Sequence, residues 1–231
     1  NAQLIATAAT RPGRCLEIGA GRGTKTHVMM CQAKRAGYDR QHTALDLHDR
    51  KCDQNLARLH KAGIRGVRTV SGDACELDAV LTSFDAMLGE PALFDTVFID
   101  APCSGTGTMR RHPEIPWRLT EKDVTTELPK LQLTMLKEAA ARVAADGELV
   151  YATCSVFDEE NAQVVDAFLA SPEGTDFSLA PLSEAQILQL PEFAQAKKLV
   201  SVRQNDRGLF QSVPVNADSY DGHFCARLVH K

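Results

Sequence analysis

Two cysteines and one aspartate follow stretches whose composition is typical of buried strands. Asp100 and Cys103 lie in the run Asp-Ala-Pro-Cys-Ser-Gly-Thr-Gly at 100–107, directly after an apolar, β-branched stretch at 94–99. Cys154 lies in Thr-Cys-Ser at 153–155, directly after a similar stretch at 148–152. In open α/β sheets, ligands bind at the carboxyl ends of the strands. We therefore expect both thiols and the carboxylate to face one crevice.

These residue types together suit a demanding addition reaction. A cytosine ring is a poor nucleophile at carbon 5, but addition of a thiolate at carbon 6 converts it into an enamine that can attack a methyl sulfonium. An acid near ring nitrogen 3 would offset the developing charge, and a base must then remove the carbon-5 proton so that the enzyme is expelled. Asp100, Cys103 and Cys154 can supply these groups. Either cysteine alone could equally be a small buried hydrophobic residue.

A glycine-rich segment at 19–23, Gly-Ala-Gly-Arg-Gly, separates a predicted strand from a predicted helix. Glycines there let the backbone approach a ligand at a helix N-terminus, but the segment alone could serve a dinucleotide, S-adenosylmethionine or only a tight turn. Asp46, at the end of the next strand, could accept both hydroxyls of a ribose, and Asp73 could meet an adenine amine. Glu17 would suit the positive charge of a methionine group better than a pyrophosphate. These acids favour S-adenosylmethionine.

Along the chain, apolar runs typical of strands alternate with patterns typical of helices. We predict strands at 14–18, 42–46, 67–70, 94–99 and 148–152, with further extended segments at 199–202, 209–213 and 223–229. We predict helices at 24–36, 50–62, 120–145 with a break at Pro129, 158–170 and 183–190. This alternation predicts a doubly wound α/β sheet with one reversed strand near the C-terminus.

Composition limits the class of protein. A chain of 231 residues, 44% of them hydrophobic, suffices for one α/β domain over 1–231, which we expect to be a monomer. The net charge of −4 argues against nucleic-acid binding through overall charge, so such binding needs a local basic patch. Seven cysteines without a Cys-x-x-Cys pair favour a reducing cytosol over disulfides or a metal site. No apolar run approaches the length of a membrane span, so we expect a cytoplasmic protein.

The chain resembles the Sun-type (Fmu/nucleolar) RNA cytosine-5 methyltransferases along almost its whole length. The likeness rests on DAPCSGTG at 100–107, RRHPEIPWR at 110–118, LVYATCS at 149–155 with EEN at 159–161, and DGHFCARL at 221–228. It implies a Rossmann-like class I methyltransferase fold, whose sheet is mostly parallel and seven-stranded with an antiparallel C-terminal strand. It also implies S-adenosyl-L-methionine as cofactor, and RNA as substrate, ribosomal rather than transfer RNA.

The resemblance assigns roles to single residues. In that family the cysteine of the Thr-Cys motif attacks the base, and the cysteine of the Pro-Cys motif assists product release. Carried over, Cys154 attacks, Cys103 assists release, and Asp100 contacts the target base, with Lys25 matching the family's loop lysine. The DNA enzymes attack with the Pro-Cys cysteine, so the presence of both cysteines favours RNA. The expected cofactor contacts are Glu17, Gly19, Ala20, Gly21, Arg22, Gly23, Thr24, Lys25, Asp46, Asp73 and Asp100.

The cofactor loop departs from the family pattern. The family usually has Asp-x-Cys-Ala-x-Pro-Gly-Gly-Lys-Thr, whereas this chain has Glu-Ile-Gly-Ala-Gly-Arg-Gly-Thr-Lys-Thr at 17–26. Lys25 and Thr26 are retained, and the proline is lost. The loop instead resembles that of general S-adenosylmethionine methyltransferases, which leaves the cofactor class unchanged.

A basic segment with one aromatic residue follows the first cysteine. Arg110, Arg111, His112, Trp117 and Arg118 could contact phosphates and stack on a base, or simply form a solvated charged loop. A base inside a stacked helix must be flipped out or unpaired before it reacts. Members of the family commonly carry an additional RNA-binding domain, often upstream, and none is evident here. We therefore expect this chain to bind RNA weakly without further sequence.

Two other classes of function remain open at this point. A non-catalytic RNA-binding or assembly factor could retain the fold, although keeping both cysteines and Asp100 argues against it. A methyltransferase for a small molecule or a protein would form no covalent adduct with RNA. That alternative leaves the paired cysteines unexplained.

Overall fold

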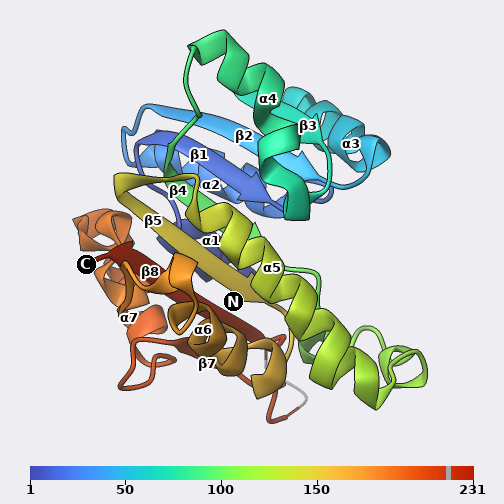
Figure 1. Cartoon of the computed structure of the whole chain (residues 1–231). Coiled ribbons are helices and arrows are strands. Elements are labelled where there is room, and N and C mark those ends of the chain that lie inside the picture. Colours follow the sequence, from blue (N-terminus) through green and yellow to red (C-terminus); the bar gives the residue numbers. More distant parts are fainter. Residues whose placement is uncertain (217–219) are drawn as a thin grey trace.

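The computed structural model describes residues 1–216 and 220–231, and its centre is one twisted β-sheet (Figure 1). Along the sheet the strands are ordered β3-β2-β1-β4-β5-β8-β6, and β7 also pairs with β8. Their bounds are β1 Gly13–Ile18, β2 Arg40–Asp46, β3 Val67–Ser71, β4 Phe94–Asp100, β5 Val143–Thr153, β6 Phe177–Ala180, β7 Phe210–Ser212 and β8 His223–His230. Strands β1 to β5 pair in parallel, so their carboxyl ends lie along one edge.

The C-terminal part of the sheet contains the expected reversed strand. Strand β8 runs antiparallel to β5, which confirms that prediction. Its other side pairs with β6 at 227–230 and with β7 at 223–225. The two short strands therefore share one edge, and the described sheet has eight strands in seven positions. The sheet thus has one strand more than the seven that the resemblance implied, and the segment that forms β6 was not predicted as a strand.

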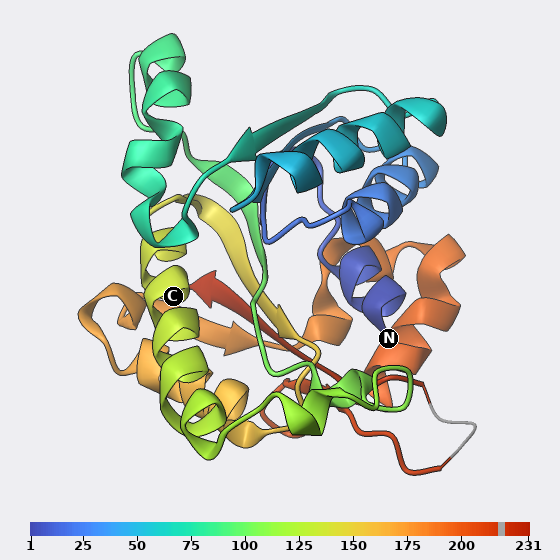
Figure 2. The same ribbon diagram turned by 90° about the vertical axis from the view of Figure 1, so that its right-hand side faces the viewer.

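Helices cover both faces of the sheet. Figure 2 shows α1, α2, α3 and α7 on one face and α4, α5 and α6 on the other. Their bounds are α1 Ala2–Ala8, α2 Thr24–Arg35, α3 Asp49–Lys61, α4 Leu77–Leu88, α5 Leu128–Ala140, α6 Ala162–Leu169 and α7 Ala194–Ser201. Short 3₁₀ turns occupy Ala74–Glu76, Thr106–Thr108, Ile115–Trp117, Asp158–Glu160, Pro172–Gly174, Leu182–Glu184, Gln186–Gln189 and Pro191–Phe193.

Alternation along the central strands divides the core into two layers. In β4, Val97 and Ile99 belong to the cluster under α4, α5 and α6, whereas Phe98 belongs to the cluster under α1, α2 and α7. In β5, Tyr151 and Val150 divide in the same way. Successive side chains of a strand point to opposite faces, so continuous apolar runs are what a sheet covered on both faces requires.

The predicted helix at 120–145 differs from the structure at its C-terminal end and at Pro129. It ends at Ala140, and β5 already begins at Val143, which pairs with Phe94. Pro129 causes no break, because a π-helical turn, Asp123–Glu127, precedes it and Leu128 N–H donates to the carbonyl of Asp123. This wider turn makes room for a residue that cannot donate a helical hydrogen bond.

Other differences lie in segments whose partners are distant in sequence. The predicted extended segment at 199–202 was wrong, since residues 194–201 form α7 with Val200 buried in the core. The predicted helix at 183–190 is a pair of 3₁₀ turns. Helices α1 and α4 were missed. Among the helices of the described residues, none has the length and apolar character that a bilayer crossing needs.

Candidate active site

The two cysteines of the sequence motifs meet at the carboxyl edge of the sheet. Strands β4 and β5 are parallel neighbours, and the N–H of Ala101, directly after β4, donates at 2.9 Å to the carbonyl of Ala152 near the end of β5. The chain segments that follow are thereby brought together. Cys103 Sγ and Cys154 Sγ are 3.3 Å apart, although 51 positions separate them in sequence. The two thiols thus lie side by side, and their opening onto a common crevice stays a prediction.

The environment makes the two sulfur atoms unequal. The hydrogen bond to Cys154, together with burial, raises the pKa of Cys103 well above its usual value. The same hydrogen bond lowers the pKa of Cys154. Burial and the negative charge of Asp100 oppose this effect, and the positive charge of Lys25 supports it. In the contact itself either sulfur could be the donor, and the direction of the two pKa shifts favours the Cys103 thiol in that role. A thiolate is the reactive form of cysteine, so this arrangement favours Cys154 as the nucleophile.

A lysine–aspartate ion pair lies next to the cysteines. Lys25, in the first turn of α2, places Nζ 2.5 Å from Oδ2 of Asp100, the last residue of β4. Burial raises the pKa of Asp100, and Lys25 only partly offsets this effect. Burial also disfavours the ammonium group, but Asp100 more than compensates and raises the pKa of Lys25. Lys25 is consequently a fixed positive charge beside Cys154.

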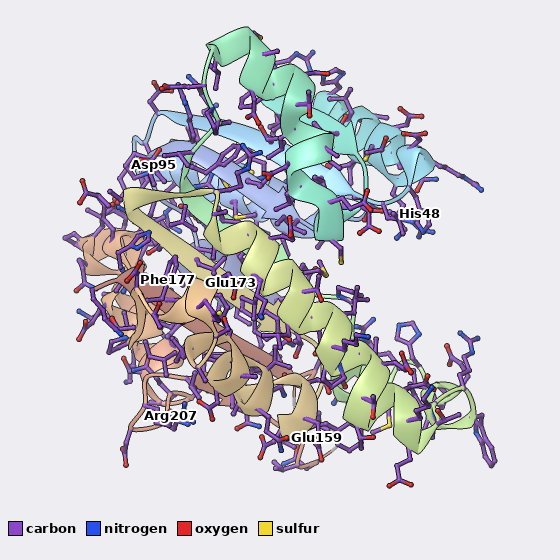
Figure 3. All side chains as sticks on the ribbon, in the orientation of Figure 1. His48, Asp95, Glu159, Glu173, Phe177 and Arg207 are labelled. Carbon is purple, nitrogen blue, oxygen red and sulfur yellow. The ribbon has the colours of Figure 1, made fainter. Side chains whose placement is uncertain are left out.

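A cavity of about 370 Å³ opens next to this ion pair, over the ends of β1, β2 and β3. Of the predicted cofactor residues, its lining contains Gly19, Gly21, Asp46, Asp73 and Asp100. Asp46 accepts hydrogen bonds from Gly21 N–H at 3.0 Å and from His48 N–H at 3.1 Å. His48, which is labelled in Figure 3, marks the entry of the chain into α3. The carboxylate at the end of β2 thus borders the cavity and is held by the glycine loop.

The glycine at the start of the loop is required by its surroundings. Gly19 has a φ of 76°, and a Cβ there would lie 2.3 Å from the carbonyl oxygen of Asp100. Any other residue would therefore be strained and would push apart the loop and the end of β4. This close contact keeps the cavity adjacent to the ion pair.

Glu17 lies beneath the loop and not on the cavity wall. It is fully buried, and its Oε2 accepts hydrogen bonds from Thr26 Oγ1 at 2.6 Å and His42 Nε2 at 2.8 Å. Burial opposes a charged His42, but Cys15 and Glu17 outweigh it and raise the pKa of His42 to about 9. Glu17 is therefore absent from the cavity lining, and its predicted contact with the cofactor stays a prediction. Its position inside β1 directs it to the face of the sheet that α2 covers, where it binds Thr26 near the start of that helix.

Other loop residues also lie outside the cavity lining. These residues lie in the loop before α2 or in the first turn of that helix. They are Ala20, Arg22, Gly23, Thr24 and Lys25. Conversely, Leu47, His48, Lys51, Leu131 and Met135 line the cavity without having been predicted. The first three lie at the start of α3 or just before it, and the last two lie in α5. In the sequence, only Leu47 and His48 could have been recognised, because they directly follow Asp46.

The cavity has the chemistry of an adenosine site. Asp46 is an acceptor suited to ribose hydroxyls, and Asp73 borders the cavity at the end of β3. Leu47 and Met135 supply apolar surface of the kind that packs against a flat base. These residues fit an adenosine-bearing cofactor.

The basic segment lies between β4 and α5, at the far end of α5 in Figure 1. Trp117 is 90% exposed. Arg111 forms an ion pair with Asp221 at 2.6 Å, and His112 lies 3.5 Å from Glu114. Part of the positive charge of the segment is thus already compensated, and Trp117 is its most accessible aromatic surface.

The sheet order, the reversed β8 and the cavity at the ends of β1 to β3 define a Rossmann-like class I methyltransferase fold. A family model described as 16S rRNA methyltransferase RsmB/F matches residues 5–229, and the chain belongs to that family. Membership of this methyltransferase family confirms the expected Sun-type family and S-adenosyl-L-methionine as the cofactor.

Curated relatives carry the same family name. The chain is 32% identical to "Ribosomal RNA small subunit methyltransferase B" of Citrobacter koseri and 34% identical to that of Salmonella arizonae. Each match includes 94% of this chain and 42% of the relative. The chain therefore spans about two fifths of the length of these relatives.

Solved structures confirm the fold. "Crystal Structure of PH0851" superposes with a TM-score of 0.78 at 26% identity and includes 99% of this chain and 46% of that one. NSun6 from Pyrococcus horikoshii, solved with SFG, gives a TM-score of 0.73 at 18% identity, with 99% and 51% coverage. A methyltransferase from Streptococcus mutans, in complex with SAH, gives 0.52 at 12% identity, with 100% and 95% coverage.

Proposed function

We propose that this chain transfers a methyl group to carbon 5 of a cytidine in ribosomal RNA, and that residues 1–231 constitute the catalytic domain. The observation that carries the proposal is the contact between Cys103 and Cys154, whose sulfur atoms are 3.3 Å apart and unequal in pKa. A methyltransferase for amines or hydroxyl groups needs no such pair. Methylation at a ring carbon of cytosine needs a nucleophile that adds and is later expelled.

The reaction follows from the residues around the pair. Cys154 adds as the thiolate to carbon 6, which breaks the 5,6 double bond and leaves electron density on carbon 5. Asp100 contacts the target base, and the Lys25 ammonium group paired with it offsets the negative charge that develops at ring nitrogen 3. S-adenosyl-L-methionine supplies an electrophilic methyl group when bound. Loss of the carbon-5 proton to a base re-forms the double bond and expels Cys154, and Cys103 stabilises the departing thiolate by its hydrogen bond.

We assign the cavity over β1, β2 and β3 to the cofactor. Asp46 would bind the ribose hydroxyls, Asp73 the adenine amine, and the backbone of Gly19 and Gly21 would border the methionine group. Support comes from their shared place on the lining and from the hydrogen bond between Gly21 and Asp46. Because Lys25 points to Asp100 and not into the cavity, its role is to hold the charge beside the cysteines.

We assign RNA contact to the segment at 109–118. Support comes from its adjacency to the cysteine motif and from the exposed indole of Trp117, a surface on which a base can stack. A cavity of about 350 Å³ beside it is lined by residues that include Met109, Pro116 and Phe157. The target base must leave its stack to reach Cys154, and an apolar surface next to the site lowers the cost of unstacking.

The proposal is tested by transfer of tritiated methyl from S-adenosylmethionine to unmodified total RNA, followed by nucleoside analysis. Labelled 5-methylcytidine in the ribosomal RNA fraction is the expected result. Label in another nucleoside would refute the cysteine chemistry. Absence of label, both with this chain and with a longer protein of the length of its relatives, would favour a non-catalytic RNA-binding role.

A further inference from the structure

A buried carboxylate lies between the two cysteine segments and has no part in the reaction described above. Glu160 ends the 3₁₀ turn Asp158–Glu160, which follows β5 and leads into α6, and its side chain is fully buried. Glu159, labelled in Figure 3, marks the place of this turn in the fold. Burial of a carboxylate is costly unless its oxygens are hydrogen-bonded, so the contacts of Glu160 identify what it does.

The contacts of Glu160 reach the residue that follows each cysteine. Oε2 accepts a hydrogen bond from the backbone N–H of Ser104 at 2.8 Å, and Oε1 accepts one from Ser155 Oγ at 2.6 Å. Gln132 Nε2, from α5, donates to Oε2 at 3.0 Å. All three donors are neutral and buried, so each needs an acceptor within the protein. One carboxylate therefore connects the segment after β4, the segment after β5 and helix α5.

The hydroxyl groups of the two segments extend this connection. Ser104 Oγ and Ser155 Oγ lie 3.1 Å apart, and Thr106 Oγ1 lies 3.1 Å from Ser104 Oγ. Because Ser155 Oγ donates its proton to Glu160, it accepts from its other neighbours, including Phe157 N–H at 3.1 Å. Glu160, as the acceptor at the end of this row of hydroxyl groups, sets the direction of the hydrogen bonds along it.

We propose that Glu160 is a positioning residue that holds the Cys103 and Cys154 sulfur atoms in hydrogen-bond contact and thereby keeps Cys154 in its nucleophilic form. The role of Cys154 as nucleophile rests on the proposed function. The contact between the sulfur atoms depends on two segments that are not adjacent in sequence, and the carboxylate is the shared acceptor of both. Without it, Ser104 N–H and Ser155 Oγ lose their common partner, and the sulfur contact is left to weaker links such as that from Cys154 N–H to Cys103 Sγ at 3.4 Å.

The test is the pH dependence of alkylation of Cys154 by iodoacetamide in the full chain, followed by mass spectrometry of the cysteine peptides. In Glu160→Gln the shape is kept, but one oxygen becomes an NH₂ group that cannot accept a hydrogen bond. The midpoint of Cys154 alkylation should rise by about one pH unit, and its rate at neutral pH should fall roughly tenfold. Tyr151→Phe is the matched control, because Tyr151 Oη donates at 2.6 Å to the main-chain carbonyl of Glu160 and not to its carboxylate. This control should leave the midpoint unchanged.

An unchanged alkylation profile in folded Glu160→Gln protein would overturn the proposal, as would an equal shift in Tyr151→Phe. If Glu160→Gln does not fold, Ser155→Ala replaces it, because this variant keeps the carboxylate and removes the hydroxyl that donates to Oε1, together with that hydroxyl's contacts to Ser104, Thr106 and Phe157. A rise of the midpoint in Ser155→Ala supports the proposal, and no rise overturns it. Since the measurement follows a thiol and not methyl transfer, its failure is distinguishable from failure of the proposed function.

Discussion

Lys25 Nζ lies 2.5 Å from Asp100 Oδ2, and this contact joins the helix after the glycine loop to the strand that leads to the first cysteine. Both partners act on Cys154, since Lys25 lowers its pKa and Asp100 raises it. The ion pair therefore balances two opposing charges beside the nucleophile. A change in either partner should appear as a change in the ionisation of Cys154.

Lys25→Met should raise the pKa of Cys154, because it removes a positive charge and leaves Asp100 unpaired. Less thiolate is then present at neutral pH, so methyl transfer should fall by about 10- to 100-fold and the acidic limb of its pH profile should move to higher pH. The measurement is the rate of methyl transfer from pH 6 to 9. Lys34→Met, on an exposed position of the same helix, is the control and should behave as wild type. A lower rate without a shifted limb would show that Lys25 does not act through Cys154.

Cys154→Ser should abolish methyl transfer, since a serine hydroxyl is scarcely ionised at neutral pH. The expected loss is at least about 1000-fold, which corresponds to roughly 4 kcal/mol in the barrier. Methyl transfer to RNA and the denaturation-resistant protein–RNA adduct are measured together, and both should be lost. Cys31→Ser, at an exposed cysteine of α2, is the control. Near-normal turnover of Cys154→Ser would remove Cys154 as the nucleophile.

Cys103→Ala should accumulate a covalent protein–RNA adduct. Methyl transfer to carbon 5 can still occur, but the departing Cys154 thiolate loses the hydrogen bond that spans 3.3 Å in the structure. The adduct is detected as a band that resists denaturation and is sensitive to nuclease. An active variant that gives no such band would exclude a role of Cys103 in product release.

Asp46→Ala should weaken the binding of S-adenosylmethionine by about 10- to 100-fold, as expected for the loss of hydrogen bonds to a charged acceptor. The affinity is measured by calorimetry in the absence of RNA. Asp53→Ala, on an exposed position of α3, changes the net charge equally and should leave the affinity unchanged. Equal affinities for Asp46→Ala and wild type would show that the ribose assignment is wrong.

The buried pair of His42 and Glu17 should make stability depend on pH. The pKa of His42 is about 9 in the folded protein, above its usual value of 6.5, so protonation stabilises the folded state. This contribution is fully present below pH 6.5 and is lost as the pH rises through about 9, and its size is on the order of 3 kcal/mol. Urea unfolding is measured between pH 6 and 9. The decline of the wild type should be smaller in His42→Gln, and parallel pH profiles would contradict a charged His42.

Local sequence determined the central strands and the placement of the cysteines. The runs at 94–99 and 148–152 are rich in apolar residues, so each was predicted as a buried strand and the residues after it were expected at the carboxyl edge, as the structure has them. Asp46 was predicted for the same reason, because it ends β2. The family resemblance also depended on these local motifs alone.

Tertiary structure decided what depends on contacts between distant segments. The spacing of Glu17 from the loop does not reveal that Thr26 and His42 bind it beneath the loop. Strand β6 forms because it pairs with β8. Helix α7 forms because it buries Val200 in the core. The role of Glu160 depends on partners 56 and 28 positions away in sequence. A sequence determines such a contact only through the whole fold, because the energy of a hydrogen bond depends on where both partners finally lie.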